Sequence, residues 1–128
     1  MLDPDGAGFL DARKVLRGEG RSQDFELGIE NGANTSIGLV ATNARLTKAQ
    51  TTKIAQMAQD GLARTIYPAH TMGDGDTVFA LATGTLEGQD NVTLIGALAA
   101  DVMAEAILRA VRLAEGLPGI PSVSDLGR

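Results

Sequence analysis

The chain has 128 residues, of which 44% are hydrophobic and only 3% aromatic, with a formal net charge of −5 and no cysteine. This length suits one domain with an aliphatic core. The negative charge and the lack of a basic cluster exclude nucleic acid or an anionic membrane as the main partner, because both need concentrated Lys and Arg.

The missing cysteine excludes disulfides, a thiol nucleophile and a Cys-based zinc site. The first residues, 1–5, lack the basic and apolar run of a secretory leader. The most apolar segment, residues 92–111, contains Asp101 and Glu105, which predicts a soluble helix and no membrane span. We therefore expect a cytoplasmic protein with small or neutral ligands.

Residues 1–34 are rich in Gly, Asp and Arg and predict turns around one or two short strands. Within them, residues 3–14 have acids at some positions of a calcium-binding loop. Lys14, however, stands where the closing bidentate Glu of such a loop belongs. We predict a surface turn here and no metal site.

The first regular segments are a strand and a helix. Residues 36–42, SIGLVAT, are short, partly β-branched and bounded by turn residues, which predicts a strand buried on both faces. Thr47 and Gln50 then match a capping box, and apolar residues follow at helical spacing. A helix over residues 47–65 follows, and Pro68 ends it.

The second half repeats this order. Residues 73–76, GDGD, form a tight acidic turn into a second strand over residues 77–84, which is also predicted to be buried on both faces. A long helix over about residues 91–115 follows and is closed by Gly116 and a proline two residues later. Strand, helix, strand, helix predicts an α/β layer arrangement.

Thr35 stands directly before the first strand and has two interpretations. In one, the Asn31-Gly32 turn continues through Asn34, and Thr35 has no chemical role. In the other, Thr35 is a nucleophile that needs a base. Cleavage between Asn34 and Thr35 would provide one, because a free α-amino group has a reference pKa of about 7.7 to 8.0.

Three more polar residues are candidates for a site. Asp74 and Asp76 lie two apart at the start of the second strand, where their side chains can project to the same side. Acids beside glycine are also ordinary turn residues. His70 is the single histidine, and because a metal site needs further ligands we expect it to be satisfied by local hydrogen bonds.

Several segments, taken in order, closely resemble the DmpA-like peptidases, the L-aminopeptidase/D-esterase family S58, and in particular its nylon-oligomer hydrolase branch. The similarity covers roughly residues 28–115 and is carried by residues 34–50, 57–64, 68–71 and 74–84. Members of that family are self-cleaving amidohydrolases with an N-terminal nucleophile.

The resemblance implies roles for four residues. Self-cleavage would occur between Asn34 and Thr35, and Thr35 would be the nucleophile. Asp74 and Asp76 would be the paired acids of the nylon-oligomer hydrolase branch, which orient and polarise the amine and the hydroxyl of the nucleophile. Substrates would be short peptides, amino-acid amides or esters, or ω-amino acid oligomers, with no cofactor and no metal.

The resemblance also implies a layered α/β (α+β) sandwich, part of a four-layer α-β-β-α fold of the N-terminal-nucleophile type and truncated at its N-terminal side. Residues 1–34 would end the α portion, and residues 35–128 would form the β-chain portion with a C-terminal tail. Family members have a longer α portion that supplies a Lys and an Asn to the site. We expect that missing portion and further αβ units, in a homo-oligomer, as partners of a C-terminal fragment that exposes sheet edges and apolar faces.

Two alternatives remain open. Ornithine acetyltransferases are similar in fold and also self-cleave before a threonine, but their Gly- and Met-rich context around it is absent here. A truncated module that neither cleaves nor turns over substrate is the alternative without catalysis.

Overall fold

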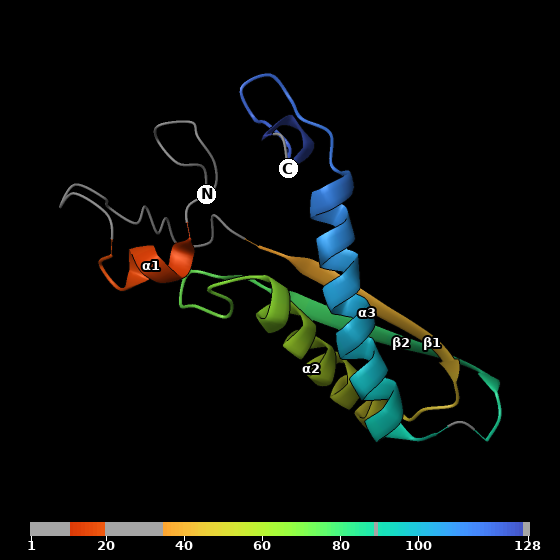
Figure 1. The fold of residues 1–128 in the computed structure, drawn as a ribbon. Coiled ribbons are helices and arrows are strands. Elements are labelled where there is room, and N and C mark those ends of the chain that lie inside the picture. The colour runs from red at the N-terminus through yellow and green to blue at the C-terminus, as the bar shows by residue number, and fades with distance from the viewer. Residues whose placement is uncertain (1–10, 20–34, 89, 127–128) are drawn as a thin grey trace. The chain divides into compact units, whose positions relative to one another are not determined.

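The computed structural model describes residues 11–19, 35–88 and 90–126. Its elements are shown in Figure 1: α1 (Ala12–Leu16), β1 (Ile37–Ala44), α2 (Lys48–Thr65), β2 (Thr77–Leu86), α3 (Val92–Leu113) and a 3-10 helix at Ser124–Leu126. The predicted order of strand, helix, strand and helix is confirmed, with every end within two residues of its predicted place. The protein is a small mixed α/β structure.

The chain divides into two compact units. The larger unit, residues 30–107, contains β1, α2, β2 and the first part of α3. The smaller unit combines residues 1–29 with residues 108–128. Among the described residues, no helix has the length and apolar character needed to span a bilayer.

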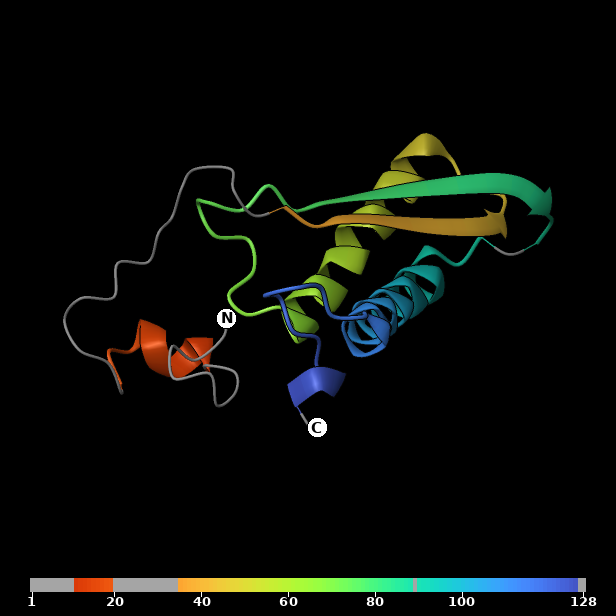
Figure 2. The ribbon, with the colours of Figure 1, turned by 90° about the horizontal axis from the view of Figure 1, so that it is seen from above.

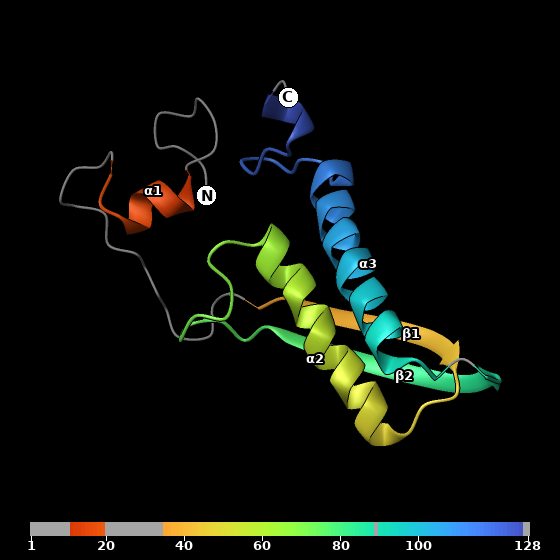
Figure 3. The ribbon, with the colours of Figure 1, turned by 60° about the horizontal axis from the view of Figure 1, so that its bottom comes forward.

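In the larger unit, β1 and β2 form a parallel pair with Ile37 opposite Thr77 and Thr42 opposite Ala82. A parallel pair needs a crossover connection, and α2 provides it. Figures 2 and 3 show α2 and the first part of α3 on the same face of this two-stranded sheet. The unit is thus a β-α-β crossover with a second helix beside the first.

Local signals explain where α2 begins and ends. Thr47 is its N-cap: the Thr47 hydroxyl accepts a hydrogen bond from the Gln50 N–H, and the Gln50 side chain accepts one from the Thr47 N–H at 2.8 Å. At the other end Ile66 is extended, and a cis peptide bond joins Tyr67 to Pro68. The predicted capping box and the predicted proline stop are both confirmed.

The core lies between the sheet and the two helices, and its side chains are aliphatic. Gly61 of α2 allows the helices to approach closely, because a Cβ there would lie 2.5 Å from the carbonyl oxygen of Ala100 in α3. Arg64 and Asp101 form an exposed ion pair across the same two helices. The buried cluster consists of Val40, Ile54, Ala58, Leu62, Val78, Ala99 and Met103.

The prediction that both strands are buried on both faces is wrong. Val40 and Val78 face the helices and are buried, whereas Leu39 and Phe79, on the opposite face, are 61% and 57% exposed. Side chains alternate between the two faces of a strand, and both helices lie on one of them. The other face is apolar and open, which agrees with the expectation that this chain exposes an apolar surface.

In the smaller unit, residues 11–19 contain the short helix α1 where the sequence predicted turns and strands. Asp11 caps this helix, and its hydrogen bonds with the Arg13 side chain and backbone lower the pKa of Asp11 from 3.8 to about 2. Near the C-terminus, the backbone N–H and the hydroxyl of Ser122 both donate to Asp125 and lower the pKa of its carboxyl. Residues 1–10 and 20–34 lie outside the described part of the chain.

The difference in burial between Ile54 and Ile37 predicts that the two side chains contribute differently to the free energy of unfolding. Ile54→Ala removes a side chain that is fully buried in the core, and we expect it to lower the free energy of unfolding by about 2 to 5 kcal/mol. The matched control, Ile37→Ala, changes a side chain that is 75% exposed and should cost less than about 1 kcal/mol. Urea unfolding followed by circular dichroism measures both, and equal losses would contradict this packing.

Candidate active site

The candidate residues gather at one end of the sheet. Parallel strands begin at the same end, so the segment before β1 and the loop before β2 meet there (Figure 2). Thr35 lies in the first of these segments, and Asp74 and Asp76 lie in the second. Since Ile37 is opposite Thr77, the register places position 35 beside position 75.

Two hydrogen bonds join the segments. The Thr77 N–H donates to the Ser36 carbonyl oxygen at 2.9 Å, which extends the ladder by one step beyond β1. The Ser36 N–H donates to Asp76 Oδ1, also at 2.9 Å, in a partly buried position. The Asp76 carboxylate therefore holds the peptide unit that directly follows Thr35.

Thr35 itself is exposed, and its side chain lies against Gly75. The hydroxyl is therefore accessible and next to the loop that contains both acids. Ser36 and Gly75 were not among the residues singled out from the sequence. The only sequence signal for Gly75 is its position between the two acids in GDGD.

Asp74 makes different contacts from Asp76. Its Oδ2 accepts a hydrogen bond from the Thr71 N–H at 2.7 Å, and its own N–H donates to the Thr71 carbonyl oxygen at 3.1 Å. These bonds close the turn before β2, as an ordinary turn aspartate does. Within the described residues the contacts join Asp76, and not Asp74, to the segment after Thr35.

Asn34 and His70 were the other two candidates. Asn34 lies outside the described residues. His70 is exposed with φ of 59°, in the left-handed region, and its ring forms no hydrogen bond to another described residue, so the expected local bonding is not found. In the described ranges, no group of three or more His, Asp or Glu side chains could hold a metal ion.

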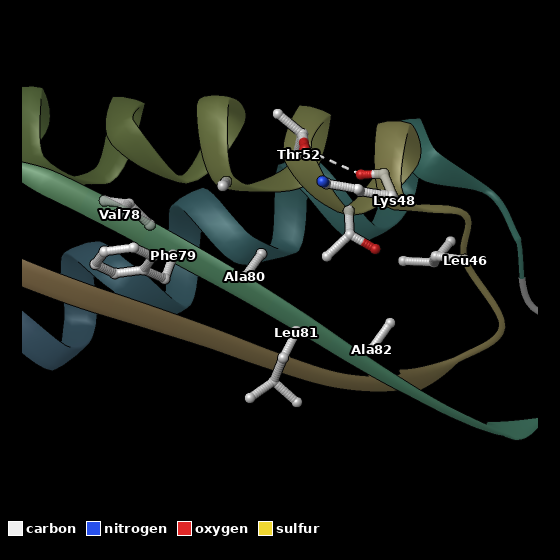
Figure 4. A pocket seen from close by; sticks show the side chains of 10 residues that line it. Leu46, Lys48, Thr52, Val78, Phe79, Ala80, Leu81 and Ala82 are labelled. Carbon is white, nitrogen blue, oxygen red and sulfur yellow. Dashed lines mark hydrogen bonds between the residues drawn. The ribbon is translucent and has the colours of Figure 1, made fainter.

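A separate hollow of about 520 Å³ lies between the first half of α2 and β2 (Figure 4). Lys48 and Thr52 reach it from α2, and the Thr52 hydroxyl donates to the Lys48 carbonyl oxygen at 2.9 Å. Neither Thr35 nor either aspartate lines this hollow, so it is not part of the candidate site. Its lining residues are Leu46, Lys48, Thr51, Thr52, Ala55 and Val78 to Ala82.

Comparison with known proteins identifies relatives of the chain. The profile of peptidase family S58 matches residues 8–123. An uncharacterized aminopeptidase of Mycobacterium leprae is 50% identical over 102 residues, covering 70% of this chain and 28% of the relative. An uncharacterized aminopeptidase of Mycobacterium bovis is 46% identical over 106 residues, covering 73% and 31%.

A third relative has a more specific name. A 6-aminohexanoate-oligomer endohydrolase of Kocuria is 33% identical over 95 residues, covering 66% of this chain and 27% of the relative. The chain therefore spans less than a third of the length of each of these relatives.

The contact between Asp76 and Ser36 predicts a loss of stability. Asp76→Ala leaves the partly buried Ser36 N–H without its acceptor, which should lower the free energy of unfolding by about 1 to 2 kcal/mol. Asp76→Asn keeps an acceptor oxygen, so its free energy of unfolding should fall by less than that of Asp76→Ala. Asp90→Ala, at an exposed position, is the control and should change stability by less than about 0.5 kcal/mol. A loss for Asp76→Ala no larger than for Asp90→Ala would contradict the contact.

Proposed function

The chain belongs to peptidase family S58, and we propose that it supplies the nucleophile-bearing part of a self-processing amide hydrolase. The observation that carries this proposal is the hydrogen bond from the Ser36 N–H to Asp76. It supports a site in which a carboxylate lies one peptide unit from Thr35. An amine formed at Thr35 would then be within reach of a group that can orient it.

In the first reaction, the Thr35 hydroxyl attacks the carbonyl carbon of Asn34. The C–N bond to Thr35 breaks, an ester forms between Asn34 and the Thr35 oxygen, and the hydroxyl proton moves to the released amine. Water then hydrolyses this ester. The products are a chain ending at Asn34 and a chain beginning at Thr35 with a free hydroxyl and a free α-amine.

In the second reaction, the same hydroxyl attacks the amide carbonyl of a substrate, and the α-amine of Thr35 accepts the proton. The amine passes the proton to the leaving amine of the substrate, and water hydrolyses the acyl-threonine ester. Asp74 and Asp76 orient and polarise the amine and the hydroxyl. Backbone N–H groups and donors from the α portion stabilise the oxyanion.

Substrates of this enzyme are short peptides, amino-acid amides or esters, or ω-amino acid oligomers. The names of the relatives support this range, since they include aminopeptidases and a 6-aminohexanoate-oligomer hydrolase. The paired acids favour the oligomer branch. Catalysis needs neither cofactor nor metal, because the nucleophile and its base belong to one residue.

Partners of the chain are an α portion of the same enzyme and further αβ units. The open apolar face of the sheet, with Leu39 and Phe79, supports this proposal, because large exposed apolar patches mark surfaces that bind another layer or partner. A second sheet packed on this face, with helices on its own outer side, would complete a four-layer α-β-β-α sandwich.

Intact-mass analysis tests the first reaction without any assumption about substrate. In an S58 enzyme that contains this segment together with the rest of the family chain, wild-type protein should yield a product that begins at Thr35. Thr35→Ala should leave the chain uncut, because the attacking oxygen is gone. Thr35→Ser should still be cut, since it keeps a hydroxyl. An uncut wild type that still hydrolyses amides would rule out this mechanism, and an uncut, inactive wild type would favour the non-catalytic module.

Amide turnover tests the acids in the same enzyme. Asp74→Ala and Asp76→Ala should each lower kcat by at least about 100-fold, because each is proposed to position the nucleophile and its base. Asp60→Ala, on the exposed side of α2, is the control and should leave kcat within about twofold. If either variant keeps near-normal turnover, that aspartate does not position the nucleophile and is only a turn residue.

A further inference from the structure

Gly75, in the segment that leads into β2, lies against the side chain of the proposed nucleophile, Thr35. The parallel register and the bond between the Thr77 N–H and the Ser36 carbonyl fix position 75 beside position 35. A hydrogen bond from the Ser36 N–H to Asp76 joins the two residues that follow Thr35 and Gly75. The relative placement of Thr35 and Gly75 is therefore set on both strands.

The approach between the two residues is too close for a side chain at position 75. A Cβ built on Gly75 would lie 2.6 Å from Thr35 Oγ1, but 3.5 Å from Cγ2 and 3.6 Å from Cβ of the same threonine. Separations of 3.5 and 3.6 Å are ordinary van der Waals contact, whereas 2.6 Å is a clash. The steric clash therefore involves only the hydroxyl oxygen among these three Thr35 atoms.

Backbone geometry gives no other reason for glycine at this position. Four described glycines, Gly18, Gly84, Gly88 and Gly119, have positive φ, where an L side chain is strained, and Gly75 does not belong to this group. The φ angle at position 75 therefore allows alanine. Among the described residues, the Thr35 hydroxyl is the one group that a methyl group at position 75 would meet at less than 3.0 Å.

We propose that Gly75 is a positioning residue, whose missing side chain allows the Thr35 hydroxyl to point toward the loop that contains Asp74 and Asp76. This inference rests on the proposed function of Thr35. A methyl group at position 75 would force Thr35 to rotate about χ1, because a staggered rotamer with hydrogen toward position 75 is the one arrangement that avoids the clash. The oxygen would then move to the place that Cγ2 occupies now, which is 3.5 Å from that methyl group, and would no longer lie in its present position.

Rotation should cost little stability, because Thr35 is exposed, but it should slow the chemistry. Misplacing a reacting atom by about 1 Å can cost about 100-fold in rate. We expect Gly75→Ala to slow self-cleavage at Thr35 by about 10- to 100-fold. In enzyme that is eventually cut, kcat should fall while KM stays within about twofold.

The first experiment observes the contact itself, independently of any activity. In the uncut 128-residue chain, three-bond NMR couplings that report χ1 of Thr35 are compared between wild type and Gly75→Ala. Met72→Ala, a fully exposed position of the same loop, is the matched control. A changed rotamer in Gly75→Ala alone is the expected result, and an unchanged rotamer would overturn the inference.

The second experiment measures the self-cleavage rate by intact mass in the S58 enzyme that contains this segment, together with the thermal midpoint. Slow cleavage with a midpoint within about 3 °C of wild type supports the positioning role. Cleavage at the wild-type rate despite a changed rotamer overturns it while leaving the proposed function intact. A midpoint loss above about 10 °C in Gly75→Ala but not in Met72→Ala would mean that Gly75 supports the whole loop, which also overturns the inference. A wild type that is never cut overturns the proposed function instead, and the role of Gly75 with it.

Discussion

The parallel pairing of β1 and β2 is the constraint on which the rest of this structure depends. Two parallel strands cannot be joined by a hairpin, so the chain must return through a crossover element, which is α2. The crossover brings the chain back to the end of the sheet from which it started. Ser36 and Asp76 are forty residues apart in sequence and meet there for this reason. The candidate site is thus a consequence of the topology.

Packing in the larger unit relies on close approach of small side chains, because aromatic residues are rare. Gly61 lets α2 touch the backbone of α3, and Gly38 leaves room on β1 for Met103. A Cβ at Gly38 would lie 2.7 Å from the Met103 methyl group, so the helix sits directly on the strand. Small residues thereby place both helices on one face of the sheet, and the core is formed there.

No helix covers the opposite face of the sheet within the described residues. Leu39 and Phe79 point away from the helices and remain exposed, although their size and chemistry suit a packed interface. A two-stranded sheet is marginal by itself, and it gains stability when further layers or strands cover it. The proposed sandwich would satisfy this requirement, and the site at the end of the strands would then belong to an assembled enzyme.

The sequence by itself determined four of the elements, β1, α2, β2 and α3, because the signals for them act locally. The capping box at Thr47 and the proline at position 68 delimit α2, and they depend only on neighbouring backbone groups. The family could be recognised for a similar reason, since its motifs occur as ordered blocks along the chain. Thr35, Asp74 and Asp76 were identified from those blocks.

Only the tertiary structure decided how these residues differ. Because side chains two residues apart in a strand point to the same side, the sequence gives no way to distinguish Asp74 from Asp76. In the structure, Asp74 accepts a hydrogen bond from the Thr71 N–H, whereas Asp76 accepts one from the Ser36 N–H. Likewise, alternating apolar residues cannot reveal whether one face of a strand or both are covered, because the covering layer comes from elsewhere. Contacts between distant segments depend on strand register and crossover direction, and no local stretch of sequence encodes either.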